Sequence, residues 1–188
     1  EVVGNNFEYD GLGSGVTALS ATLFSMENSS FSGITDEFLE ISAYLYDSTG
    51  FFTNSTFVGG GVGIYSYLSA IESSGNTFSE QSGYSVFLRS TLPSESAHSF
   101  ENDQFIGTAS TEFGSTPTPI RCLDGGSVNI DGTSFLDIQT IYGVHLSGQT
   151  ISGAYLPGCN SEIEDTTFDQ IDGYSIYATG GDHDLSDV

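Results

Sequence analysis

Cationic side chains are almost missing from this chain of 188 residues: it has no lysine, and Arg89 and Arg121 are its only arginines. Against them stand 25 aspartate and glutamate residues, so the formal net charge at pH 7 is −23. A protein that binds nucleic acid needs a cationic surface that displaces counterions from the phosphates. The composition therefore argues against nucleic acid as a partner.

Long hydrophobic runs are missing too, and proline is scarce. No stretch of about 18 apolar residues occurs, so we expect no transmembrane helix. The four prolines, Pro93, Pro117, Pro119 and Pro157, fall in the longest stretches outside the repeat described next, which are 91–99, 109–119 and 149–161. We interpret these stretches as loops, because proline is usually kept out of stacked strands. With no linker elsewhere, the chain is expected to form one domain over residues 1–188.

What the chain does contain is a short phrase that recurs seven times: an apolar residue, a spacer, then Asn, Gly or Asp, two mostly polar residues, and Phe. Only Ser73 departs from the apolar slot. Gly, Asn and Asp readily adopt a left-handed backbone conformation, so the third slot predicts a sharp corner between two short strands. The expected corner residues are Gly4, Asn28, Asn54, Gly75, Asn102, Gly132 and Asp165. The phenylalanines, 21 to 33 residues apart, are Phe7, Phe31, Phe57, Phe78, Phe105, Phe135 and Phe168.

A further strand is expected after each Phe, because short β-branched and aromatic runs with period-two alternation recur there. These runs are 16–19, 38–41, 64–68, 84–88, 120–123, 144–146 and 174–178. Three short strands per repeat, with like residues at each corner, resemble the right-handed parallel β-helix of the pectin-lyase-like superfamily. The resemblance implies an all-β solenoid of about seven coils with an internal Phe ladder. A β-sandwich is the alternative, but it does not require Asn or Gly at one fixed offset from Phe.

Two sequons and two cysteines bear on where the chain resides. Asn28-Ser-Ser and Asn54-Ser-Thr are N-glycosylation sequons at corners of neighbouring coils, and each Asn is either a corner residue alone or also a glycan carrier. Cys122 and Cys159 either pair, which would indicate an oxidising compartment, or remain free, since Cys122 occupies an inward strand position. We expect an extracellular or cell-surface protein kept soluble by its acidity; halophilic adaptation fits less well, because charged residues make up only 14%.

The first functional hypothesis is structural. The repeat reaches almost to both ends and leaves no obvious capping helix, so strand edges are expected to stack on another copy. Tyr67, Phe87 and Tyr177 are expected to form an exposed aromatic line suited to lateral packing. We therefore predict a non-enzymatic rod that self-assembles into a filament or sheath or serves as an adhesin. The first residue, Glu1, suggests a processed or excised chain, either whole or a unit of a larger extracellular assembly.

Two alternatives remain from other classes. In a polysaccharide lyase or hydrolase, the only candidate catalytic residues would be Arg121, His145 and Asp124, and the motifs of the pectin hydrolases are missing. A glycan-binding protein would use the same aromatic line as a stacking platform. No cofactor or metal site is expected: the phrase from Gly180 to Asp184 faintly resembles a Ca²⁺-binding repeat, but one copy is better interpreted as a polar tail. Scattered carboxylates allow diffuse Ca²⁺ binding at most.

Overall fold

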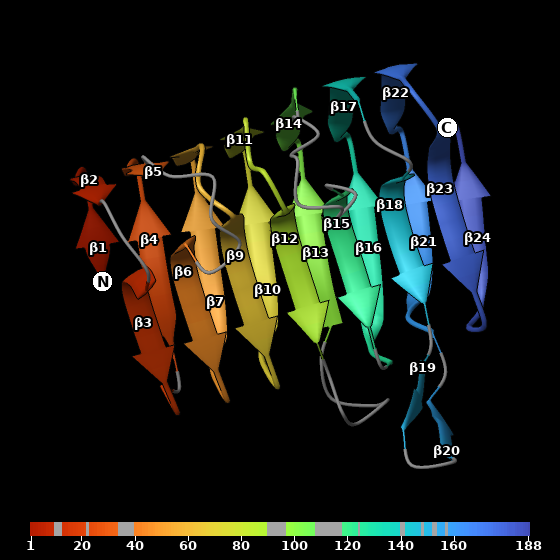
Figure 1. The fold of residues 1–188 in the computed structure, drawn as a ribbon, viewed down its shortest axis with the longest axis horizontal. Helices are drawn as coiled ribbons and strands as arrows, with labels where there is room; N and C mark the ends of the chain where they lie inside the picture. The colour runs from red at the N-terminus through yellow and green to blue at the C-terminus, as the bar shows by residue number, and fades with distance from the viewer. Residues whose placement is uncertain are drawn as a thin grey trace.

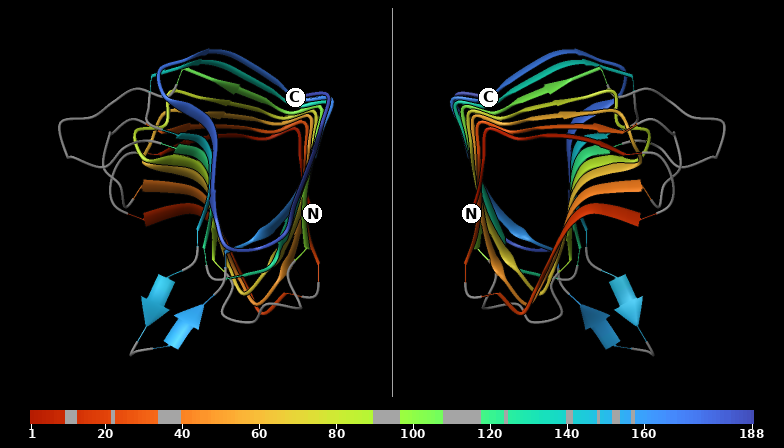
Figure 2. Two further views of the ribbon diagram at one scale, coloured as in Figure 1. Left: turned by 90° about the vertical axis from the view of Figure 1, so that its right-hand side faces the viewer. Right: turned by 90° about the vertical axis from the view of Figure 1, so that its left-hand side faces the viewer.

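Three β-strands build each coil, and equivalent strands of successive coils pair in parallel, so the coils stack from the N- to the C-terminal end (Figure 1). The computed structural model describes residues 1–9, 13–21, 23–33, 40–89, 97–107, 118–123, 125–139, 142–147, 149–151, 154–156 and 158–188. These residues include no helix. The chain is thus an all-β, right-handed parallel β-helix, as the repeat predicts, and three walls enclose its interior (Figure 2).

The walls are three parallel sheets. Sheet A comprises β1 (Val2–Val3), β4 (Phe24–Glu27), β7 (Thr49–Thr53), β10 (Ala70–Ser74), β13 (Ala97–Glu101), β16 (Ser127–Asp131), β21 (Asn160–Glu164) and β24 (His183–Ser186). Sheet B comprises β2 (Asn6–Tyr9), β5 (Ser30–Gly33), β8 (Thr56–Val58), β11 (Thr77–Ser79), β14 (Gln104–Ile106), β17 (Ser134–Ile138) and β22 (Thr167–Ile171). Sheet C comprises β3 (Gly13–Leu19), β6 (Glu40–Tyr46), β9 (Val62–Tyr67), β12 (Tyr84–Arg89), β15 (Thr118–Leu123), β18 (Tyr142–Ser147) and β23 (Tyr174–Thr179). A small antiparallel hairpin pairs β19 (Gln149–Ile151) with β20 (Ala154–Leu156).

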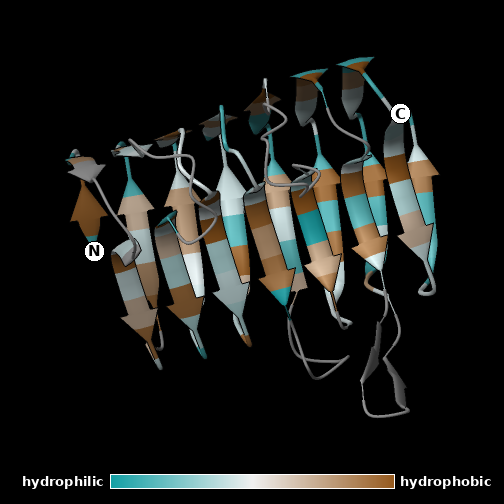
Figure 3. Ribbon diagram, in the orientation of Figure 1, coloured by the Kyte–Doolittle hydropathy of each residue, from teal (hydrophilic) through white to brown (hydrophobic). Residues whose placement is uncertain are grey.

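The phenylalanines of the repeat form one continuous stack inside sheet B. Each ring lies 4.6 to 5.4 Å from the next, centroid to centroid, and the planes of neighbouring rings differ by at most 10°. The five middle rings are fully buried, whereas Phe7 and Phe168 at the two ends are half-buried. Inward and outward residues alternate along the strands of sheet A, which appears as alternating hydropathy bands in Figure 3. The core is therefore built from columns of like side chains.

The corner between sheets A and B is made by one left-handed residue in every coil. All seven expected corner residues have positive φ, between 43° and 65°. The residue that follows each corner is polar, and from Asn5 to Asp103 its backbone N–H donates to the equivalent side chain of the next coil. The Ser55 N–H donates to Asn76 Oδ1 at 2.8 Å, and the Asn76 N–H donates to Asp103 Oδ1 at 2.6 Å. This polar ladder satisfies backbone groups that the turn leaves without a sheet partner. It also accommodates Ser73, whose hydroxyl accepts a bond from Asn76 Nδ2 at 2.9 Å.

A row of small residues on sheet C faces the Phe stack. A Cβ added to Gly63 would lie 2.5 Å from the Ser85 carbonyl oxygen and 3.2 Å from the Phe78 ring. Gly143 is confined in the same way by Ser175 and Phe168. Pro119 occupies this row, buried within β15, so the expectation that every proline lies in a loop is wrong for Pro119. Its compact ring fits where larger side chains do not, although it removes one backbone donor.

Several strand boundaries differ from the sequence expectation. The sequence predicts a strand over 38–41, but β6 spans Glu40–Tyr46, and Ala43 pairs with Val16 and Ile64. Inward burial of Ala43 and Leu45 sets this register, while residues 38 and 39 lie outside the described part of the chain. The three expected loops also contain strand residues: β13 begins at Ala97 and β15 at Thr118, and the stretch 149–161 contains the hairpin of β19 and β20 and the start of β21. The expectation that these stretches are loops throughout is therefore wrong. Of the other prolines, Pro93, Pro117 and Pro157 lie outside the described residues.

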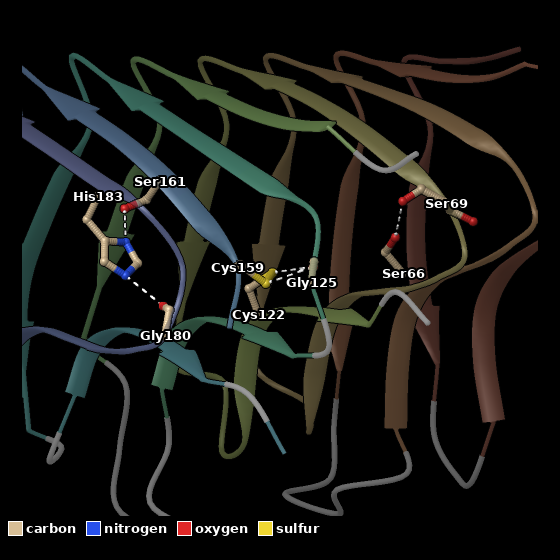
Figure 4. The surroundings of a disulfide bond; sticks show 8 residues. All are labelled: Ser66, Ser69, Cys122, Gly125, Cys159, Ser161, Gly180 and His183. Carbon is tan, nitrogen blue, oxygen red and sulfur yellow. Dashed lines mark hydrogen bonds between the residues drawn. A yellow bond between two sulfur atoms is a disulfide. The ribbon is translucent and has the colours of Figure 1, made fainter. Parts of the chain in front are cut away.

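Cys122 and Cys159 form a disulfide that joins a strand of sheet C to the start of the next coil's sheet A strand (Figure 4). The two residues are 37 positions apart, their Cα atoms are 6.1 Å apart, and both side chains are buried. Both sulfur atoms lie near the Gly125 carbonyl oxygen. The bond therefore ties neighbouring coils together within the core.

Candidate functional site

The outward side of sheet C is the most distinctive surface among the described residues, and we call its outward side chains the tyrosine face. The parallel register places equivalent residues in columns along the rod. One column comprises Thr17, Tyr44, Tyr65, Phe87, Arg121, His145 and Tyr177; the next comprises Leu19, Tyr46, Tyr67, Arg89, Leu123, Ser147 and Thr179. A third, which comprises Ile41, Val62, Tyr84, Thr118, Tyr142 and Tyr174, runs beside them.

Both arginines of the protein lie on the tyrosine face, and each contacts a tyrosine. Arg121 Nη1 donates to the Tyr84 hydroxyl at 2.8 Å, and its guanidinium lies 5.5 Å from the centre of the Tyr84 ring. The Arg89 guanidinium lies 5.7 Å from the centre of the Tyr67 ring. Such cation–π contacts are worth about 0.5–2 kcal/mol, depending on desolvation. The aromatic rings thus hold both cations in place on one wall of the rod.

Near the C-terminal end of this face, His145 lies among three tyrosines. Its ring centroid is 4.5 Å from that of Tyr142 and 5.2 Å from that of Tyr177, and Tyr174 lies 6.0 Å from both tyrosines. His145 pairs across the strands with Arg121, as the sequence predicts. Burial, and then the Arg121 charge, lower the pKa of His145 to about 4, so its imidazole is neutral at pH 7. Asp124, the third residue of the hypothetical enzyme site, lies outside the described residues.

Charge is strongly segregated between the walls. The seven strands of sheet C contain one acidic residue, Glu40, which is buried. The strands of sheet A carry exposed acidic residues at Glu27, Glu72, Glu101, Asp131, Glu162, Glu164 and Asp184. The cross-strand register stacks three of these carboxylates, Glu101, Asp131 and Glu164, in one column. Like charges directly opposite one another are destabilising, so this wall is electrostatically unfavourable in isolation.

The outer surface of sheet A is also hollowed. An open depression of about 920 Å³ extends over β10, β13, β16, β21 and β24. Its outward lining includes carboxylates, amides and hydroxyls, from Glu72, Ser99, Asn129, Glu162 and Asp184. These groups are mostly hydrogen-bond acceptors, whereas the tyrosine face presents phenol and guanidinium donors.

The expected aromatic line is only partly exposed. Tyr177 is 36% exposed and Tyr67 is half-buried, but Phe87 is only 9% exposed, so its expected exposure is wrong. Phe87 packs with Val62 and Tyr84 in a small cluster on the outward side of sheet C, and the rings of its neighbours cover it. Sequence reasoning missed most of the face, namely Tyr44, Tyr46, Tyr65, Tyr84, Tyr142 and Tyr174. The signal was available in the period-two spacing of Tyr44 with Tyr46 and of Tyr65 with Tyr67.

Both sequon asparagines are exposed left-handed corner residues on adjacent coils. Asn28 Nδ2 donates to Glu27 Oε1 at 3.2 Å, and the Asn54 amide oxygen lies over the corner Gly75 of the following coil. The side chains therefore point along an accessible edge of the rod. Whether they carry glycans stays a prediction.

The segment from Gly180 to Asp184 forms a turn and the first two residues of β24, and not a polar tail. Gly180 and Gly181 have φ of 72° and 86°, and the following strand pairs with β21. The His183 side chain links the turn to β21: one ring nitrogen lies 2.9 Å from Ser161 Oγ and the other 2.9 Å from the Gly180 carbonyl oxygen (Figure 4). The phrase thus builds a coil corner, because two glycines supply its left-handed backbone.

Among the described residues, no group of three or more His, Cys, Asp or Glu side chains could hold a metal ion, and no helix is long and apolar enough to cross a membrane. Comparison of the chain with known protein families, with curated proteins and with solved structures finds no match.

Proposed function

We propose that this chain is a non-enzymatic structural protein of the cell exterior, related in fold to the pectin-lyase-like β-helices. In this role it is a rod that self-assembles into a filament or sheath, or serves as a surface adhesin. The disulfide, the acidic composition and the accessible sequons support an extracellular location, because disulfides persist in oxidising compartments.

The observation that carries the proposal is that core columns end in exposed residues. Leu185 pairs with the fully buried Ile163 in an inward column of sheet A, yet Leu185 is 51% exposed. Phe7 and Phe168, at the ends of the Phe stack, are half-buried while their neighbours Phe31 and Phe135 are fully buried. A second copy stacked on either outermost rung of the described residues would bury these side chains and pair with the outermost strands.

The test is the concentration-dependent assembly of the purified chain, followed by light scattering and electron microscopy. We expect end-to-end polymers, and we expect Leu185→Lys to prevent them because it places a charge in the stacking surface. Asp184→Lys, on the same strand but facing outward, is the matched control and should still form end-to-end polymers, which electron microscopy would show. A chain that stays monomeric at high concentration contradicts the proposal.

Glycan binding is the second candidate, and the cluster of Tyr142, Tyr174 and Tyr177 favours it. Tyr174 is 60% exposed, so its ring is free to stack on a sugar. A glycan array with the wild-type chain and with Tyr174→Ala tests this candidate: binding that survives the substitution would remove the cluster from consideration. The enzyme hypothesis is tested separately, since it predicts activity on a polyuronate that Arg121→Ala abolishes.

A further inference from the structure

We propose that the tyrosine face of one rod docks laterally on the acidic outer surface of sheet A of a second copy. This inference rests on the proposed structural function and adds to it the second surface through which rods associate. It concerns the sides of the rod, whereas end-to-end stacking concerns its terminal rungs.

Charge complementarity is the first argument. The tyrosine face holds Arg89 and Arg121, which are the protein's only arginines, and no outward acidic side chain occurs on the strands of sheet C. Sheet A presents the column of Glu101, Asp131 and Glu164, whose mutual repulsion an approaching guanidinium would relieve. Any other pairing of these two walls, A on A or C on C, places like charges opposite one another and is disfavoured.

Hydrogen-bond chemistry and spacing agree with this pairing. Tyr46, Tyr174 and Tyr177 are exposed by 36% or more and carry phenol donors. The depression on sheet A offers carboxylate, amide and hydroxyl acceptors over five strands. Both surfaces repeat at the spacing of neighbouring strands, about 4.8 Å, so a contact made by one coil can recur in the next.

The geometry of the pairing determines the kind of assembly. The two surfaces are different walls of the same rod, so the contact is heterologous: each docked copy still has a free sheet A and a free tyrosine face. Heterologous contacts that do not close into a ring produce open-ended assemblies. Lateral docking combined with end-to-end stacking therefore gives a two-dimensional sheath or a bundle, and end-to-end stacking alone gives thin filaments.

A charge exchange between two variants tests the proposal. The first variant carries Arg89→Glu and Arg121→Glu on the tyrosine face. The second carries Glu101→Lys and Glu164→Lys on sheet A, which leaves Asp131 between two lysines and so does not endanger the fold. Each variant alone should need an about tenfold higher concentration for lateral assembly than the wild type, because like charges then face each other. An equimolar mixture of the two variants should assemble laterally at the wild-type concentration, since each altered face then meets an opposite charge.

The controls separate the possible failures. The double variant Asp169→Lys and Asp172→Lys changes the net charge by the same amount as the sheet A variant, but on and beside sheet B, where both residues are exposed. It should assemble like the wild type. If Arg121→Glu impairs folding, as circular dichroism would reveal, Arg89→Gln with Arg121→Gln replaces it. Bundling by either charge-reversal variant alone at the concentration at which the wild type bundles overturns lateral docking, and so does an equimolar mixture that forms no bundles at that concentration. Thin filaments without bundles in the wild type overturn it too but leave the proposed function intact, whereas wild-type monomers overturn both.

Discussion

Replacing Asp103 with Asn should stabilise the protein at neutral pH. Asp103 belongs to the polar ladder beside the corner and is only 1% exposed. Its Oδ1 accepts the Asn76 N–H, but Oδ2 has no hydrogen-bond partner. At equivalent positions of neighbouring coils, Asn76 Nδ2 donates to the Phe52 carbonyl oxygen at 2.8 Å, and Thr133 Oγ1 donates to the Phe100 carbonyl oxygen at 3.3 Å. An ionised carboxylate cannot donate such a bond, but an Asn amide can.

The expected gain in the free energy of unfolding follows from the pKa of Asp103. Burial raises that pKa from 3.8 to about 6, although hydrogen bonds with Ser73 and Asn76 oppose the rise. Since a tenfold change in proton affinity is worth about 1.4 kcal/mol, ionised Asp103 costs the folded state about 3 kcal/mol at pH 7. The folded protein binds the proton more tightly than the unfolded chain does. The favourable contribution of protonated Asp103 is therefore fully present below pH 3.8 and is lost as the pH rises through 6.

Chemical denaturation of the wild type and of Asp103→Asn at a series of pH values from 3.5 to 7.5 measures this effect. The variant should gain nothing at the acidic end and about 3 kcal/mol at neutral pH, which corresponds to a rise in Tm of about 6–12 °C. Asp169→Asn, which neutralises an exposed carboxylate on sheet B, should change the free energy of unfolding little. A difference between Asp103→Asn and wild type that does not vary with pH, or a loss of stability at pH 7, would refute the reasoning.

Three further predictions concern the same core. Phe105→Ala removes a fully buried ring from the middle of the Phe stack and should lower the free energy of unfolding by about 3–5 kcal/mol. Phe7→Ala should lower it less, because Phe7 is only half-buried. His98 is buried with neither ring nitrogen hydrogen-bonded, and burial lowers its pKa from 6.5 to about 4; stability should fall by about 3 kcal/mol as the pH drops through this range, and His98→Leu should remove that part of the slope. Replacing Cys122 and Cys159 together with Ser should cost about 4 kcal/mol, because the disulfide closes a loop of 37 residues; an unchanged denaturation midpoint would contradict this.

How far the sequence predicts the structure depends on whether a feature is local. The corner residues were predictable because a left-handed conformation selects Gly, Asn or Asp within one short phrase. The corner between sheets C and A was not predictable. Ser20, Asp47 and Leu68 occupy it with φ of 48°, 48° and 53°, and a leucine does not indicate a left-handed conformation. The polar ladder could have been found, since the residue after each corner is always polar: Asn5, Ser29, Ser55, Asn76, Asp103, Thr133 and Thr166.

The tyrosine face could not be assembled from the sequence, because coils of unequal length conceal which outward residues share a column. The burial of Phe87 depends on Tyr65 and Tyr84, and the first of these belongs to another coil. The register of β6 likewise depends on pairing with β3 and β9. Such relations exist only once the coils are stacked.

Stacking also explains how a protein with a net charge of −23 can present a wall free of exposed acidic residues on its strands. Each outward column of a β-helix is drawn from one position of the repeat, so one wall can collect tyrosine and arginine while another collects carboxylates. An isolated soluble rod gains nothing from this separation, because mixed charges on every wall would reduce the repulsion within the column of Glu101, Asp131 and Glu164. The separation is favourable when the two walls meet across rods, since the carboxylate column then faces the guanidinium groups that its own wall lacks. The charge pattern therefore supports the lateral docking that we propose.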